Sequence, residues 1–85
     1  MNLEKSKKRI AKKIKMGFQG YPKISIHYKG DGYEQAVVQF QEEEGAPVME
    51  QVFHSKLDAR EDEVIQSALV KTIERSEAKT VELFD

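Results

Sequence analysis

A glycine-flanked turn between two alternating segments, KISIHYKGDGYEQAVVQF at residues 23–40, constrains the fold of this chain more than any other feature. Apolar side chains recur at every second position on both sides of the turn, which is typical of half-buried β-strands. The alternating apolar positions are Ile24, Ile26, Tyr28, Ala36, Val38 and Phe40. The segment therefore predicts an antiparallel β-hairpin with one face toward a core.

The length of the turn decides the register of this hairpin. A two-residue Asp31–Gly32 loop would place Gln35 and Gln39 on the core side. A three-residue loop, 30–32, pairs Ile26 with Ala36 and keeps both apolar sets on one face. We predict the three-residue loop.

A third strand is expected at residues 48–54, and its pattern allows either face to be buried. We predict that Met49 and Phe53 point inward, because Glu50 on the opposite face is costly to bury. The outer face of the sheet is then unusually apolar, and apolar surface patches often mark interfaces. It forms a candidate interface of Tyr33, Val37, Val48 and Val52.

Two helices are expected to flank the strands. The first is capped by Asn2 and runs to Gly20, with an earlier end at Gly17 as the alternative. Its apolar stripe consists of Leu3, Ile10, Ala11, Ile14 and Phe18.

The second helix is expected to begin at Asp58, with Glu61 completing a capping box, and to run to Ser76 or Glu77. Its stripe consists of Ile65, Ala68, Leu69, Thr72, Ile73 and Ser76, with Val64 at the edge. Residues 79–84 form either a short last strand or a tail. We therefore predict one α+β domain over residues 1–85: a three-stranded antiparallel β-meander with both helices packed on one face, in the order α-β-β-β-α.

This order resembles that of the double-stranded RNA-binding domain, and the resemblance covers element order alone. In that family the second helix typically begins with lysines that contact phosphates. Here the matching segment, LDAREDEV, carries Asp58, Glu61, Asp62 and Glu63 against Arg60 alone. These acids suit a helix N-terminus and would repel a phosphate backbone.

Several classes of chemistry find no support in the sequence. The chain has no cysteine, which removes disulfides, thiol nucleophiles and cysteine zinc sites and fits a reducing cytoplasm. His27 and His54 lie on strands two apart, about 10 Å from each other, too far to chelate one ion directly. No nucleophile motif, glycine-rich phosphate loop, membrane span or signal peptide is recognisable. We expect a non-enzymatic cytoplasmic protein with no metal, cofactor, small-molecule substrate or membrane partner.

The charge distribution suggests one further surface. Residues 1–30 have a net charge of +8 and residues 31–85 of −9, so the chain as a whole carries −1. A set of basic side chains on the first helix forms a candidate anion or partner surface: Lys5, Lys8, Arg9, Lys12 and Lys15. The alternative is that the acidic half neutralises them. We expect a protein-interaction or regulatory module that binds an unknown protein or a second copy as a homodimer; the alternative is sequence-independent nucleic-acid binding through the first helix.

Overall fold

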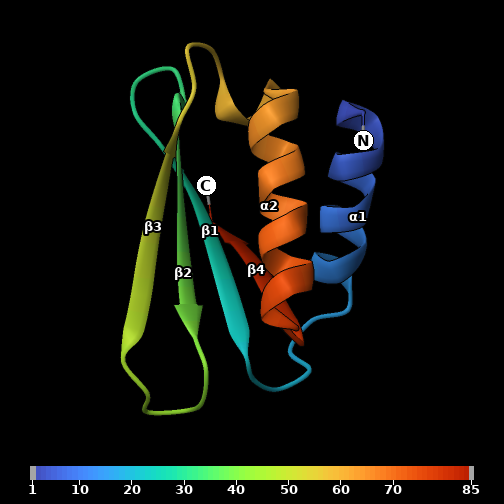
Figure 1. Cartoon of the computed structure of the whole chain (residues 1–85), viewed down its shortest axis with the longest axis vertical. Coiled ribbons are helices and arrows are strands. Elements are labelled where there is room, and N and C mark those ends of the chain that lie inside the picture. Colours follow the sequence, from blue (N-terminus) through green and yellow to red (C-terminus); the bar gives the residue numbers. More distant parts are fainter. Residues whose placement is uncertain (1, 85) are drawn as a thin grey trace.

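The structure is a computed structural model, which describes residues 2–84, and it is an α+β fold with two helices and a four-stranded sheet (Figure 1). The elements are α1 (Leu3–Lys15), β1 (Lys23–Lys29), β2 (Gln35–Gln41), β3 (Val48–His54), a short 3₁₀ turn η1 (Ala59–Glu61), α2 (Glu63–Ser76) and β4 (Thr80–Phe84). The C-terminal segment is thus a strand, which settles the alternative that the sequence left open.

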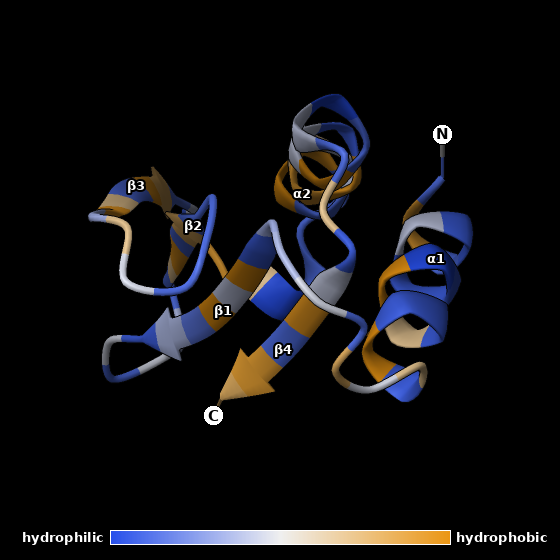
Figure 2. Cartoon of the chain, turned by 90° about the horizontal axis from the view of Figure 1, so that it is seen from below, coloured by the Kyte–Doolittle hydropathy of each residue, from blue (hydrophilic) through white to orange (hydrophobic). Residues whose placement is uncertain are grey.

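The sheet has the strand order β3-β2-β1-β4. β1, β2 and β3 form the predicted antiparallel meander, and β4 pairs with β1 in parallel. The chain therefore leaves the sheet at the β3 edge, crosses it as α2 and returns at the opposite edge as β4. This crossover places α2 on one face of the sheet, toward β1 and β4, while α1 lies beside α2 and packs against β4 on the same side (Figures 1 and 2).

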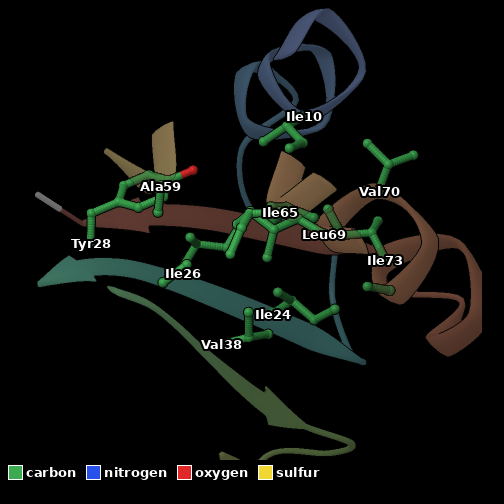
Figure 3. Close-up of a cluster of buried hydrophobic side chains, with 13 residues drawn as sticks. Ile10, Ile24, Ile26, Tyr28, Val38, Ala59, Ile65, Leu69, Val70 and Ile73 are labelled. Carbon is green, nitrogen blue, oxygen red and sulfur yellow. The ribbon is translucent and has the colours of Figure 1, made fainter. Parts of the chain in front are cut away.

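The core lies between the sheet and the two helices (Figure 3). From the sheet it takes the alternating positions predicted for the hairpin, and Ile24, Ile26 and Ala36 are completely buried. From α2 it takes Leu69 and Ile73 as expected, together with Val70, which the predicted stripe omitted. Val70 is buried because α1 packs against the flank of α2, so α2 buries a wider arc than contact with the sheet alone would require.

The hairpin register differs from the prediction by two residues. Ile26 pairs with Val38 and Tyr28 with Ala36, so that a five-residue loop, 30–34, connects the strands. Because side chains alternate with a period of two, this shift leaves the same residues on the core face. Gly30 and Tyr33 both adopt positive φ angles, and the Tyr33 amide donates a hydrogen bond to the Gly30 carbonyl. The loop therefore includes residues 33 and 34, which the prediction placed in the second strand of the hairpin.

α1 ends at Lys15, which makes the earlier of the two predicted ends the correct one. Gly17 has φ +71°, and its amide donates to the Ile14 carbonyl, as in a left-handed helix stop. Phe18 is consequently beyond the helix and 62% exposed, so its predicted place in the core is wrong. Ala11 is also exposed, and the small residue Ser6 is buried next to the helix stripe in its place.

The start of α2 also differs from the prediction. Asp58 caps the 3₁₀ turn by accepting a hydrogen bond from the Arg60 amide, and the α-helix begins five residues later, at Glu63. The true N-cap is Asp62, whose carboxylate accepts from the amides of Val64 and Ile65. The sequence contains two overlapping cap signals, at Asp58 and at Asp62, and the predicted capping box uses the first of them.

Candidate interaction surfaces

β3 is the exposed edge strand of the sheet. It pairs with β2 through seven consecutive residues without a bulge, and its other side has no strand beside it in the described chain. Six of its seven residues are exposed, among them Val48, Met49 and Val52 at 54%, 60% and 41%. Figure 2 shows the reason: α2 sits toward β1 and β4, and β3 projects beyond it.

This exposure corrects the prediction that Met49 is buried. Met49 and Phe53 do lie on the helix side of the sheet, opposite Phe40 and Ala36 on β2. Phe53 is half-buried, but α2 approaches Met49 only across a groove whose walls include Thr72 and Ser76. Both faces of β3 therefore carry exposed apolar side chains. The sequence signal that would have revealed this is the C-terminal strand, because adding β4 beyond β1 moves the sheet's centre away from β3.

The opposite edge of the sheet, formed by β4, is partly covered by other elements of the chain. β4 has five residues, and α1 packs against it. The loop after α1 covers its start: the Gln19 amide donates to the Thr80 hydroxyl, which in turn donates to the Gly20 carbonyl. Thr80 and Val81 are buried, Glu82 is half-buried, and Leu83 and Phe84 are exposed. The fold thus covers the beginning of one edge strand and leaves the other bare along its whole length.

The face of the sheet that bears no helix carries three of the four predicted interface residues. Val37 and Val52 form a cross-strand pair, continued on the β1 side by His27, which stacks on Phe84 with ring centroids 4.9 Å apart. Val37 is only 4% exposed because its strand neighbours cover it. The accessible apolar surface on this face is therefore concentrated at β3 and at the end of β4.

Tyr33, the fourth predicted interface residue, lies in the β1–β2 loop and is not part of the sheet face. The Arg60 guanidinium lies 4.0 Å from the centre of the Tyr33 ring. The Tyr33 carbonyl accepts a hydrogen bond from the Ala59 amide. Arg60 also pairs with Asp58, at 2.6 Å between Nη2 and Oδ2, and this hydrogen bond is the main reason why the pKa of Asp58 is lowered. Tyr33 thus helps to anchor the β3–α2 connection.

Six of the seven basic residues of α1 fall into two groups, and the seventh, Lys13, is half-buried. Lys7 and Arg9 form ion pairs with Glu61 and Glu74, at 2.7 and 3.1 Å. Within residues 2–84, the remaining exposed lysines of the predicted surface make no ion pair. We call them the lysine row: Lys5, Lys8, Lys12 and Lys15. Acidic residues of the same chain therefore neutralise two basic residues of α1: Arg9, which belongs to the predicted surface, and Lys7, which does not.

A buried polar contact that the sequence did not reveal ties α2 to the sheet. The Gln66 side-chain amide donates to the Tyr28 hydroxyl at 2.9 Å and to the Ala59 carbonyl at 3.0 Å. Gln66 lies outside the apolar stripe predicted for α2, yet it is 3% exposed. Its hydrogen bonds position the 3₁₀ turn against β1.

Both histidines lie on the open face of the sheet, with Val37 beside His27 and Gln35 beside His54. Among residues 2–84 there is no group of three or more His, Cys, Asp and Glu side chains that could hold a metal ion. In the same range, neither helix is long and apolar enough to span a membrane.

Comparison of the chain with protein-family models, with curated proteins and with solved structures finds no match.

Proposed function

We propose that this protein is a non-enzymatic interaction module that binds an extended protein strand at the open edge of β3. A strand added to a sheet edge gains main-chain hydrogen bonds, and alternate side chains provide specificity. The observation that carries the proposal is the contrast between the two edges: six of the seven residues of β3 are exposed and no strand lies beside it among the described residues, while the start of β4 is covered.

The side chains of β3 support this role. Proteins commonly protect an edge strand with lysines, a proline, a bulge or a charge directed inward. Between Val48 and His54 there is no lysine, proline or bulge. Glu50 is the one carboxylate, and it accepts a hydrogen bond from Gln39 on β2, which draws it away from the open edge.

The test is capture of binding proteins from native lysate with the purified chain. A Met49→Lys/Val52→Lys variant places two charges on the edge at exposed positions and should lose the proteins that the wild type retains. A Leu57→Lys/Val64→Lys variant is the charge-matched control, because these residues are 74% and 78% exposed and lie outside the strand itself. Binding that survives the β3 substitutions would refute the edge as the site.

We place this interaction in the cytoplasm, as the cysteine-free sequence suggests.

A second candidate function is sequence-independent nucleic-acid binding by the lysine row. The supporting observation is that these four lysines form no ion pair with any residue from 2 to 84, while Lys7 and Arg9 on the same helix are paired with acids. At a rise of about 1.5 Å per residue the row extends about 15 Å, which corresponds to about four base-pair steps of a duplex at 3.4 Å per step. This geometry suits phosphate contacts along one backbone.

Salt titration provides the test of this second function. Four phosphate contacts predict that log K against log salt falls with a slope of about −3.6 on duplex DNA. A Lys5→Glu/Lys12→Glu variant should abolish binding, whereas Lys71→Glu/Lys79→Glu changes the net charge equally at exposed positions outside α1 and should reduce it much less. Absence of binding at about 50 mM salt would exclude this function.

A further inference from the structure

We infer that the strand accepted by β3 is β3 of a second copy, paired antiparallel about a two-fold axis through Gln51. This inference rests on the proposed function and names its partner. The pairing would join two four-stranded sheets into one sheet of eight strands, with the helices of both copies on the same side. Each copy would keep α1 at an outer end of the assembly, because α1 and β3 lie at opposite sides of the fold (Figure 1).

The side chains of β3 favour this register over its neighbours. With Gln51 at the centre, all seven strand residues find a partner, and Met49 of one copy faces Phe53 of the other on the helix side. On the open face Glu50 lies opposite Val52, and Val48 lies opposite His54. Moving the axis by one residue to Glu50 would place two carboxylates directly opposite each other, which destabilises a cross-strand pair.

The charges at the two ends of β3 are complementary in the same arrangement. The β2–β3 loop, just before Val48, exposes Glu42, Glu43 and Glu44, whereas Lys56 is exposed just after His54. Figure 1 shows these two connections at opposite ends of β3. Antiparallel pairing therefore brings the acidic loop of each copy to the lysine end of the other, whereas parallel pairing would bring acid to acid.

The net charge of the molecule does not oppose self-association. At −1 for the whole chain, two copies repel each other little, and proteins near zero net charge associate more readily. The electrostatic repulsion that opposes association of two copies is therefore weak.

Single cysteines offer a direct test, because the chain contains none. Paired residues of antiparallel strands have Cα atoms about 4.5–5.5 Å apart, within the range that a disulfide spans. Gln51→Cys lies at the axis and should form a covalent dimer with itself under mild oxidation. Val64→Cys, exposed on α2, is the control and should remain monomeric on non-reducing gels.

A mixing experiment tests the register. Val48→Cys and His54→Cys, both at exposed positions, should each fail to cross-link alone and should cross-link rapidly when mixed. In the proposed dimer two copies of residue 48 are about 20 Å apart, given about 3.4 Å per residue along a strand, while residues 48 and 54 of different copies are neighbours.

Light scattering of the wild type separates the outcomes. A dimer with the predicted cross-links supports the inference. A dimer in which Gln51→Cys does not cross-link faster than Val64→Cys overturns the β3 pairing. A monomer at all concentrations that still captures another protein through the β3 edge overturns self-pairing and leaves the proposed function standing. A monomer that captures nothing through this edge overturns both.

Discussion

Ser6 on α1 carries a hydroxyl group that is buried without a hydrogen-bond partner among the described residues. It lies one turn before Ile10, on the buried face of the helix, and is completely inaccessible. Burying an unsatisfied polar group costs about 1–3 kcal/mol. The small side chain is tolerated where a larger one would keep the helix away from its neighbours.

We therefore predict that Ser6→Ala raises the free energy of unfolding by about 1 kcal/mol or more. Urea denaturation followed by circular dichroism measures the change. Ser67→Ala on α2 is the control, because Ser67 is only partly buried and its substitution gains mainly the helix propensity of alanine, about 0.5 kcal/mol. An equal gain for both variants, or a loss for Ser6→Ala, would contradict the assignment of Ser6 as an unsatisfied group.

Asp62 connects two elements, the end of β3 and the start of α2. One carboxylate oxygen caps the helix, and the other accepts a hydrogen bond from the Ser55 hydroxyl at 2.6 Å. The Ser55 bond, followed by the amides of Ile65 and Val64, lowers the pKa of Asp62. The unfolded chain therefore takes up this proton at higher pH than the folded chain, so the contribution of Asp62 to stability is present above about pH 4 and is lost as pH falls further.

We predict that Asp62→Ala costs about 1 kcal/mol of stability at pH 7, the usual cost of losing an N-cap. The difference in the free energy of unfolding between wild type and Asp62→Asn should shrink as pH falls below about 4, because the asparagine does not titrate. Urea titrations at pH 7, 5 and 3 measure both effects. A difference that is constant over this range would show that the Asp62 charge makes no contribution.

The same elements show how far sequence patterns predict this fold. Alternation at Ile24, Ile26, Ala36 and Val38 correctly indicated strands and their buried face, because burial of one face acts on every second residue. It could not fix the register, since a shift of two residues preserves that face, and the deciding contacts are local ones inside the 30–34 loop. Overlapping signals at Asp58 and Asp62 likewise left the start of α2 open to error.

The interaction surfaces were less predictable, because they depend on which strand lies at an edge. Val48 and Val52 were identified as candidate interface residues from alternation alone, and the structure does expose them. Met49 was assigned to the core because the pattern shows which face of β3 turns toward the helices but not how far the helices extend. That extent follows from the crossover of α2 and from β4 beyond β1, which are long-range features of the topology.

At the scale of the whole molecule, the uneven charge distribution is partly resolved by long-range ion pairs. Three pairs join the basic first 30 residues to the acidic remainder: Lys7–Glu61, Arg9–Glu74 and Lys23–Glu82. Pairs with this degree of exposure contribute about 0–1 kcal/mol each. Lys7–Glu61 joins α1 to η1, Arg9–Glu74 joins α1 to α2, and Lys23–Glu82 joins β1 to β4. The lysine row remains outside this balance and keeps its charge available to solvent.

The proposed dimer also makes stability depend on protein concentration, because folding and association are then linked. For two-state unfolding of a dimer, a tenfold increase in concentration adds about 0.7 kcal/mol per chain, which for a domain of this size raises the melting temperature by about 3–6 °C. Differential scanning calorimetry at several concentrations measures the shift. The Met49→Lys/Val52→Lys variant should melt at a temperature that does not change with concentration, while Leu57→Lys/Val64→Lys should behave like the wild type. A wild type whose melting temperature is independent of concentration up to the millimolar range would rule out a stable dimer, since an interface at the β3 edge must contribute to the stability of the chains that it joins.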